Sequence, residues 1–356
     1  MIAFIAWTPL HIMNIINTKI NYFSEEKSDL YIYGEFSNAR QLCKTIKEQN
    51  LFTNVFFIEP EEIGNKYIKI MNLIINKNNF IDYRGQYEQL FIQGENYFSK
   101  IIYGQSKKKN PRLIVNYIED GLGAYVGSKI LDITNKKNRV INFFNPYSIF
   151  KSKLSNCYVY EPDLVEVKEN ARYHPLKKLT DDNQATSIIE KVFQLQSRKD
   201  VFPGKVLYLD QPLESDQFKI NEKMIFDEIC KLVPKKDLWI KLHPRSSKNK
   251  YKDFQVIETV LPWELYFLNY DFSKTTIISP VSTAAFSPKL MMGTHSPVVL
   301  LPKVIQNQQP RVLEDDRTVT MLNNIIFFSE KFSQLDIGES YLPESIDELK
   351  ELIIND

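Results

Sequence analysis

Short apolar runs alternate with helical stretches along this chain, and that alternation constrains the fold more than any other feature. A first series of apolar runs occupies the N-terminal half, at Ile2 to Trp7, Asp29 to Phe36, Asn54 to Pro60, Gln89 to Gly94 and Arg112 to Gly121. Strands that alternate with helices pair in parallel, with helices on both faces of the sheet. Nearly continuous apolar runs are typical of strands that are buried on both sides.

The alternation lapses from about Leu164 to Val201 and then restarts. A second series of apolar runs lies at Lys205 to Pro212, Asp237 to Pro244, Phe254 to Glu258, Thr275 to Pro280 and Val298 to Pro302. A chain of 356 residues suits two domains. We therefore expect an α/β protein with two Rossmann-like, doubly wound domains, residues 1–163 and 202–356, that face a central cleft. Residues 164–201 are the expected interdomain connection, helical only near Ile188 to Gln196.

Composition and charge argue against several classes of protein. The formal net charge is +1 and no motif for reading nucleic acid occurs, so no nucleic-acid partner is expected. Cys43, Cys157 and Cys230 form no CxxC pair, which fits neither a disulfide framework nor a zinc site. The apolar N-terminus lacks the basic region of a signal peptide, and no run approaches the length of a membrane span. The expected location is the cytoplasm.

Polar residues follow three of the expected strands. Ligands of doubly wound sheets bind at the carboxyl ends of the strands, so these residues are the candidates for a site. They are Glu119-Asp120-Gly121, His243-Pro244 and Ser282-Thr283.

The acidic cluster has two interpretations. The plain one is an acidic turn in which Gly121 supplies a positive φ. The functional one is a carboxylate that faces a ligand from the end of a central strand, where partial burial raises its pKa toward that of a general base. In that case Asp120 is the expected base, and Glu119 is expected to orient it or a sugar hydroxyl.

The two histidine-proline pairs differ in their setting. The pair at 174–175 lies in the polar stretch, and we interpret it as structural. His243 ends an expected buried strand, with Lys241 and Arg245 beside it and Pro244 fixing the exit of the strand. Cations beside an imidazole suit a phosphate that gains charge as it leaves. The alternative is a histidine with an ordinary structural partner at a strand end.

Hydroxyl groups precede a helix that is expected at 284–292. Ser282 and Thr283 suit the N-cap of that helix, and hydroxyls at such a position can also hold a phosphate or carboxylate. Ser279, at the strand end itself, is their weaker companion.

Three more polar residues complete the candidates. Glu264 fits equally well a first-turn carboxylate of a helix and an acceptor for two ribose hydroxyls. Asp210 and Gln211 end the first strand of the second half, where they either line the site or turn the chain. The chain has no GxGxxG, Walker, DxD or HExxH motif, which disfavours a dinucleotide enzyme, an ATPase and a metal-dependent transferase.

The order of the three clusters carries a family resemblance. Together with the N-terminal IAWTPLH, the acidic, histidine-proline and hydroxyl clusters resemble those of bacterial sialyltransferases, most closely glycosyltransferase family 52. The resemblance covers the layout of most of the chain and a handful of residues by identity. It implies a GT-B architecture, transfer of N-acetylneuraminic acid from CMP-Neu5Ac to a terminal galactose of a surface glycan (capsule or lipooligosaccharide), an α2,3 linkage, no metal or other cofactor, and a homodimer.

The resemblance also assigns roles to residues. Asp120 would take the proton of the acceptor hydroxyl, with Asp210 as the alternative, and His243 would stabilise or protonate the departing phosphate. Ser282 and Thr283 would contact the donor, and Glu264 would hold the cytidine ribose.

Other functions stay open at this point: the same fold with a UDP-hexose or another CMP-linked acid sugar, a nucleotide-sugar epimerase, or a glycan-binding protein. The lysine-rich stretch from Lys66 to Lys77 has two interpretations, a solvated helix face or a contact with the inner face of the plasma membrane.

Overall fold

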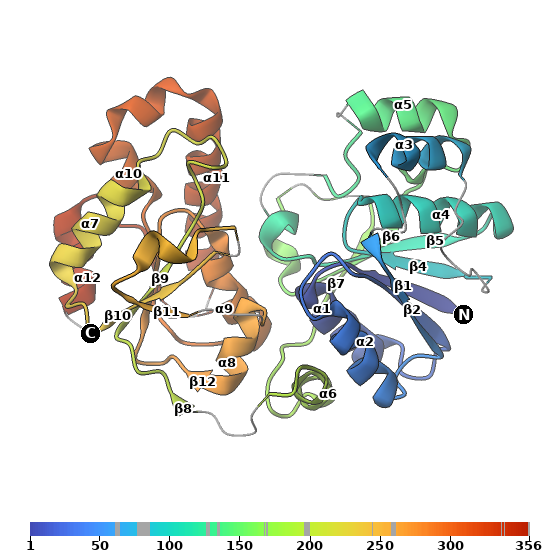
Figure 1. Ribbon diagram of the computed structural model, residues 1–356, viewed down its shortest axis with the longest axis horizontal. Coiled ribbons are helices and arrows are strands. Elements are labelled where there is room, and N and C mark those ends of the chain that lie inside the picture. Colours follow the sequence, from blue (N-terminus) through green and yellow to red (C-terminus); the bar gives the residue numbers. More distant parts are fainter. Residues whose placement is uncertain are drawn as a thin grey trace. The chain divides into compact units, whose positions relative to one another are not determined.

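Two parallel sheets, one in each half of the chain, organise the protein (Figure 1). The computed structural model describes residues 1–60, 65–76, 86–125, 129–133, 136–166, 168, 170–195, 200–243, 245–257, 261–335, 337 and 339–354. The chain divides into two units, Met1–Leu195 and Gln196–Asp356.

The sheet of the first unit has the strand order β3-β2-β1-β4-β5-β6-β7, and all neighbouring strands are parallel. Its central strands are apolar and almost fully buried, as the sequence predicts. The strands are β1 (Ile2–Ala6), β2 (Ser28–Tyr33), β3 (Asn54–Ile58), β4 (Gln89–Ile92), β5 (Ile114–Ile118), β6 (Leu154–Val159) and β7 (Arg172–Pro175).

Helices cover both faces of this sheet. Figure 1 shows α1 (Pro9–Tyr22), α2 (Ala39–Glu48) and α6 (Gln184–Phe193) on one side, and α3 (Lys66–Ile75), α4 (Tyr97–Lys109) and α5 (Lys136–Phe144) on the other. The first helix has a hydroxyl cap, because the Thr8 side chain accepts a hydrogen bond from the His11 N–H at 3.2 Å. Pro9 occupies the first helical position.

The sheet of the second unit has the order β11-β10-β9-β13-β14-β15, again with parallel neighbours. Its strands are β9 (Val206–Leu209), β10 (Leu238–Lys241), β11 (Gln255–Ile257), β13 (Thr276–Ser279), β14 (Val298–Leu300) and β15 (Ser340–Tyr341). The short strands β8 (Asp200–Val201) and β12 (Tyr270–Asp271) pair separately. The helices are α7 (Glu222–Leu232), α8 (Tyr266–Asn269), α9 (Ser287–Met292), α10 (Pro302–Gln308), α11 (Asp316–Ser333) and α12 (Ile346–Ile354).

Both sheets reverse their strand order at the same topological point. The reversal falls between β1 and β4 in the first unit and between β9 and β13 in the second, as in Rossmann-type folds. The predicted α/β class with two doubly wound units of the GT-B type is confirmed. The central cleft of the sequence-based picture stays a prediction.

Residues 164–201 differ from the expected connection. Within them, β7 extends the first sheet by pairing with β6, and α6 packs on α1 and α2. The Thr45 hydroxyl on α2 donates to the Val192 carbonyl on α6 at 2.9 Å. The first unit therefore reaches Leu195, beyond the expected end at 163. Residues 196–199 of the expected connection, and Glu258 and Lys77 at the ends of other expected elements, lie outside the described residues.

The helices of the structure can be compared with the requirements for spanning a membrane. None of the helices in the described ranges has both the length and the apolarity that are needed to cross a bilayer.

Candidate active site

Glu119 follows β5 in the first unit, and its side chain braces the loop from inside. The residue is only 2% exposed. Its Oε2 accepts hydrogen bonds from the Tyr160 N–H at 2.8 Å and from the Tyr125 hydroxyl, while its carbonyl accepts one from Asn14 Nδ2 at 2.8 Å. Because these donors occupy the carboxylate inside the protein, Glu119 fixes the position of the next residue rather than contacting a sugar.

Asp120, in contrast, keeps solvent-accessible surface, although protein atoms surround its carboxyl group closely. Its Oδ1 accepts a hydrogen bond from the Tyr117 hydroxyl at 2.7 Å. Gly121, at φ +113°, turns the chain away, which confirms the predicted positive φ. Burial of the carboxyl among its neighbours raises the pKa of Asp120, and the Tyr117 hydrogen bond opposes that rise. A carboxylate with a raised pKa and solvent access has the properties of a general base.

Trp7 and Gly94 define the space beside Asp120 Oδ2. A Cβ added to Gly94 would stand 3.8 Å from that oxygen and 3.6 Å from the Trp7 ring. The absence of a side chain at Gly94 therefore leaves room for a ligand atom between the indole and the carboxylate. Trp7 therefore belongs to this sheet edge, although its place in the IAWTPLH motif alone does not mark it as a site residue. Its position at the end of β1, next to the reversal of strand order, is the signal that identifies it.

His11 holds Trp7 in place. The buried His11 ring meets the indole edge-on at a centroid distance of 4.3 Å, and its Nδ1 accepts a hydrogen bond from the Trp7 N–H at 3.4 Å. Burial lowers the pKa of His11 to about 3, so this imidazole is neutral and acts as an acceptor. The IAWTPLH motif thus builds one wall of the site.

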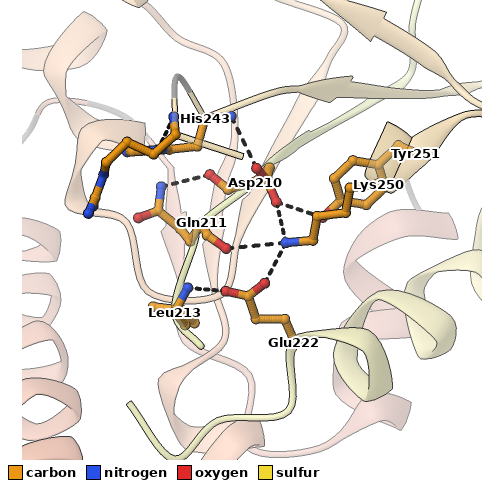
Figure 2. Close-up of polar contacts among 8 residues, drawn as sticks. Asp210, Gln211, Leu213, Glu222, His243, Lys250 and Tyr251 are labelled. Atoms are coloured by element: carbon orange, nitrogen blue, oxygen red, sulfur yellow. Dashed lines mark hydrogen bonds and ion pairs between the residues drawn. The ribbon is translucent and has the colours of Figure 1, made fainter. Parts of the chain in front are cut away.

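Asp210 follows β9 in the second unit and is surrounded by donors (Figure 2). Its side chain has no exposed surface. Oδ1 accepts hydrogen bonds from Lys250 Nζ and the Tyr251 hydroxyl, both at 2.7 Å, and Oδ2 accepts one from the His243 N–H at 3.1 Å. Lys250 also pairs with Glu222 at the start of α7. Burial alone would raise the pKa of Asp210, but these donors outweigh it and lower the pKa. Asp210 is therefore a poor base and a firm anchor for the loop that carries His243.

The imidazole of His243 is oriented by its own loop. Nδ1 accepts a hydrogen bond from the Arg245 N–H at 3.2 Å. A ring nitrogen that accepts carries no proton, so the neutral ring has its proton on Nε2. Within the described part of the chain, no hydrogen bond involves Nε2. Partial burial and the charges of Arg245 and Lys241 lower the pKa of His243, although Asp210 and Asp216 oppose this. The ring at neutral pH is thus a neutral Nε2–H donor.

The two cations beside His243 have partners of their own. Lys241 is buried, and its Nζ donates to the Leu242 carbonyl at 2.8 Å. Arg245 forms a two-pronged ion pair with Asp216, at 2.6 and 2.8 Å. Arg245 therefore fixes the loop to its neighbour, and the expected positive site is weaker than the sequence indicates.

Gln211 and Pro244 are the two further candidates next to this loop. The side-chain amide of Gln211 donates to the Asp210 backbone carbonyl at 2.8 Å. The backbone carbonyl of Gln211 accepts from Lys250 Nζ at 3.4 Å, so Gln211 is part of the same network. Pro244 lies outside the described residues.

The hydroxyl cluster follows β13. Ser279 is fully buried, and its hydroxyl accepts from the Ser282 N–H at 2.9 Å. Ser282 caps the short helix η7 (Thr283–Phe286) by accepting from the Ala284 N–H at 3.3 Å. The predicted N-cap is confirmed, and Ser279 shapes the turn. Thr283, the first residue of η7, is half-buried.

Glu264 lies in the short helix η6 (Trp263–Leu265), which is joined to the hydroxyl cluster. The Trp263 indole N–H donates to the Ala284 carbonyl at 3.0 Å. Glu264 is only 6% exposed, and burial raises its pKa while the Lys241 charge opposes the rise. A ribose hydroxyl would therefore meet a carboxyl group from which water is largely excluded. In the second unit, Lys241 lies close enough to Asp210 and Glu264 for their charges to act on it, and Asp210 accepts from the His243 N–H.

The predicted pairing of Asp120 with His243 involves the two different units of the chain. Asp120 belongs to the first unit and His243 to the second, so their meeting across a gap stays a prediction. His174, interpreted as structural, donates a hydrogen bond from Nε2 to Asn156 Oδ1 at 2.9 Å, and its ring stacks on Tyr158. Among the residues that the structure describes, no three His, Cys, Asp or Glu side chains form a group that could hold a metal ion.

In doubly wound sheets of this kind, ligands bind at the carboxyl ends of the strands, where the polar residues of both units lie. The family model described as Alpha-2,8-polysialyltransferase (POLYST) matches residues 3–300, and the chain belongs to that family. It is thus a glycosyltransferase of the sialyltransferase class, which acts on a nucleotide-sugar donor and a glycan acceptor. Sialyl transfer, predicted from the motifs, is confirmed as the class; glycosyltransferase family 52 stays a prediction.

Solved structures with a similar fold have low sequence identity to the chain. An α/β-galactoside α-2,3-sialyltransferase from Photobacterium phosphoreum is 14% identical, with a TM-score of 0.48 and 98% of each chain covered. Spinosyn rhamnosyltransferase SpnG, complexed with thymidine diphosphate, is 9% identical, with a TM-score of 0.46 and 99% of each chain covered. A UDP-N-acetylglucosamine 2-epimerase from Listeria monocytogenes, so named provisionally, is 12% identical, with a TM-score of 0.44 and coverage of 96% of this chain and 99% of its own. No curated protein matches the sequence.

Proposed function

We propose that the protein is an inverting, metal-independent sialyltransferase that takes N-acetylneuraminic acid from CMP-Neu5Ac. The observation that carries the proposal is the fixed imidazole of His243. Its backbone is anchored by Asp210, its Nδ1 is occupied by the Arg245 N–H, and its Nε2–H is left for a ligand. A neutral, oriented N–H donor suits a phosphate oxygen whose charge grows in the transition state.

The donor would be bound at the sheet edge of the second unit. His243 Nε2 would donate to the CMP phosphate, with Ser282 and Thr283 beside it and the Lys241 charge behind it. Glu264 would accept the ribose hydroxyls of the cytidine. The hydrogen bond from Trp263 in η6 to the Ala284 carbonyl in η7 supports these roles. It holds the helix with the proposed ribose contact next to the helix with the proposed phosphate contacts.

The acceptor would be activated in the first unit. Asp120 would take the proton of the acceptor hydroxyl as its oxygen forms a bond to the anomeric carbon of the sialic acid. The bond between that carbon and the phosphate oxygen breaks, and its electron pair leaves with CMP. One displacement of this kind inverts the anomeric centre. The proposal requires that Asp120 and His243 act on the same donor.

The family favours an acceptor that already ends in sialic acid. Its description names an α2,8 linkage, which is formed on sialic acid itself. The α2,3 linkage to a terminal galactose, implied by the motif resemblance, is the second candidate. In either case the product would be a surface glycan, capsule or lipooligosaccharide, made on the cytoplasmic side.

A transfer assay separates these possibilities. The protein is incubated in EDTA with CMP-Neu5Ac and either an α2,8-linked oligosialic acid or lactose, and both CMP and the extended glycan are measured. We expect CMP release with elongation of the oligosialic acid; elongation of lactose alone would select the galactose acceptor. Activity that appears only when manganese is restored would contradict the metal-independent mechanism.

The donor is tested separately. A thermal-shift comparison of CMP, UDP and GDP should give stabilisation by CMP. Stabilisation by UDP alone would contradict the CMP-linked donor and indicate a hexosyltransferase. Conversion of a nucleotide sugar to an isomer without any acceptor would indicate an epimerase.

A further inference from the structure

Two neighbouring helices of the first unit turn apolar side chains outward. On α3, Tyr67, Ile68, Met71 and Ile75 are 79%, 45%, 55% and 55% exposed. On α5, Phe143 and Phe144 are 80% and 60% exposed, and their rings contact each other. Exposed aliphatic and aromatic side chains at this density are unusual on a surface that meets only water.

The same helices are well anchored on their inner side. Leu73 of α3 and Ile141 of α5 share a buried cluster with Ile101 of α4, and Asn145 Nδ2 donates to the Leu73 carbonyl at 2.8 Å. Figure 1 shows α3 and α5 side by side over α4. Because a helix presents positions three or four residues apart on one face, Ile68, Met71 and Ile75 lie opposite Leu73. The outward apolar residues are therefore the outer face of packed helices, not a poorly folded end.

The charged side chains that α3 and α5 themselves carry are all basic. Neither α3 nor α5 contains an acidic residue, whereas together they contain Lys66, Lys69, Lys136, Lys137 and Arg139. On α5, Lys136 and Arg139 are exposed and share a face with Phe143, since they precede it by seven and four residues. The outer face of α5 thus combines cations with an exposed aromatic ring.

We propose that this surface, the outer faces of α3 and α5, docks the protein on an anionic phospholipid bilayer. The apolar side chains would enter the boundary between headgroups and acyl chains, and the cations would contact lipid phosphates. This docking is independent of the proposed transfer chemistry, since none of its residues belongs to the candidate site.

Two other occupants fit this surface less well. In a two-fold dimer a surface meets itself, so the exposed cations Lys136 and Arg139 would face or approach their own copies. A soluble acidic glycan would pair with the cations but would leave Met71, Ile75 and Phe143 without apolar partners. Of these three occupants, the bilayer is the one that supplies both an apolar layer and negative charge.

The test is co-sedimentation of the full-length protein with vesicles. One set contains phosphatidylglycerol and phosphatidylcholine in equal parts, and the other contains phosphatidylcholine alone. We expect binding to the anionic vesicles that weakens as salt is added. A Lys136→Glu/Arg139→Glu variant should lose affinity by about twentyfold or more, because each cation near an anionic surface contributes about a fivefold factor. Both changes lie in the first turn of α5, where acidic side chains favour the helix.

A Met71→Ser/Phe143→Ser variant should lose at least about tenfold in affinity, since two apolar side chains no longer leave water. The matched control is Leu313→Ser/Phe327→Ser in the second unit, where the side chains are 55% and 49% exposed. The control should bind as the unaltered protein does. Thermal melts of all variants establish that they are folded, as substitutions of exposed residues allow.

Three results would overturn the proposal. The first is no preference for anionic vesicles, or equal binding by all variants. The second is a dimer in light scattering that becomes a monomer in the serine variant, which would assign the surface to a second copy of the chain. The third is binding of soluble oligosialic acid that depends on Lys136 and Arg139 but not on Met71 and Phe143.

Discussion

The two sheet edges place an aspartate at similar topological positions and give it opposite properties. Asp120 follows a strand of the first sheet and Asp210 a strand of the second, and each accepts a hydrogen bond from a tyrosine at 2.7 Å. The pKa of Asp120 is raised, whereas that of Asp210 is lowered.

The difference lies in the other neighbours. Asp210 also accepts from Lys250 and from the His243 N–H, and a cation stabilises the charged form of a carboxyl. Asp120 has no cationic hydrogen-bond partner among the described residues, so burial decides the direction of its pKa. A carboxyl at the carboxyl end of a strand can thus be a base or a fixed support, and its partners determine which.

The largest expected effect is that of Asp120→Asn. Loss of the base should lower the sialyl transfer rate by about a thousandfold, within the usual range for a general base. Because asparagine keeps the size of the side chain and its amide oxygen can still accept from the Tyr117 hydroxyl, the free energy of unfolding should change by less than about 1 kcal/mol. Transfer kinetics and urea unfolding measure the two quantities.

Glu119→Ala is the matched control for that variant. It removes a buried acceptor of two hydrogen bonds and should cost about 2–3 kcal/mol in unfolding free energy. If Asp120→Asn retained most of the transfer rate, the assignment of the base would be wrong.

His243→Ala should have the next largest effect. Removal of one oriented donor to a developing negative charge typically costs about a hundredfold or more in rate. His174→Ala, which removes a histidine from the edge of the first sheet, is the control and should leave the rate unchanged. Since the pKa of His243 is lowered, the unaltered protein should show no loss of rate between neutral and mildly alkaline pH. A loss there would indicate that the protonated imidazole is required.

Asp210→Asn should affect both stability and rate. Replacement of the buried carboxylate by a neutral amide removes its ion pair with Lys250 and should cost about 2–4 kcal/mol in unfolding free energy, allowing for the partial exposure of Lys250. Displacement of the His243 loop should lower the transfer rate by about ten- to a hundredfold.

The pH dependence of Asp210→Asn gives a second check. The lowered pKa of Asp210 means that its contribution to stability is present above the ordinary pKa of an aspartate and is lost as the pH falls through the folded-state pKa. The difference in unfolding free energy between the two proteins should therefore shrink in acid. A constant difference would contradict the ion pair as its cause.

Tyr117→Phe should have the smallest effect on transfer. It tests whether the pKa of Asp120, rather than that of Asp210, controls the rate. The Tyr117 hydrogen bond lowers the pKa of Asp120, so its removal should raise that pKa further. A base must be deprotonated, and the acid limb of the profile of kcat/KM against pH should move to higher pH. Tyr251→Phe removes the equivalent hydrogen bond to Asp210 and should leave the limb in place. A limb that moves with Tyr251 instead would reverse the roles of the two aspartates.

Much of the fold follows from the sequence, because buried parallel strands are apolar along their whole length. The runs that start at Ile2 and Asn54 become β1 and β3. Edge strands do not carry that signal. In β7 all four residues are polar, aromatic or proline, so the Arg172–Pro175 segment looked like a linker, although it pairs with β6.

The candidate site was predictable in position but not in its networks. The strand ends identified Asp120, Asp210 and His243, because ligand sites of such sheets lie there. The partners that decide the pKa of each aspartate come from elsewhere in the chain. Lys250 stands 40 residues after Asp210, and no periodic pattern connects them. The ion pair of Arg245 with Asp216 has the same origin, which is why its charge was overestimated.

Calorimetric titration of CMP into the Asp120→Asn and His243→Ala variants is the most direct test of the account. It measures whether the second unit binds the donor while Asp120 of the first unit serves the acceptor. The account predicts that Asp120→Asn binds CMP with the affinity of the unaltered protein, since this aspartate serves the acceptor. It predicts that His243→Ala binds CMP at least about tenfold more weakly, because the phosphate loses its oriented donor. Equal affinities in both variants, or a loss confined to Asp120→Asn, would contradict it.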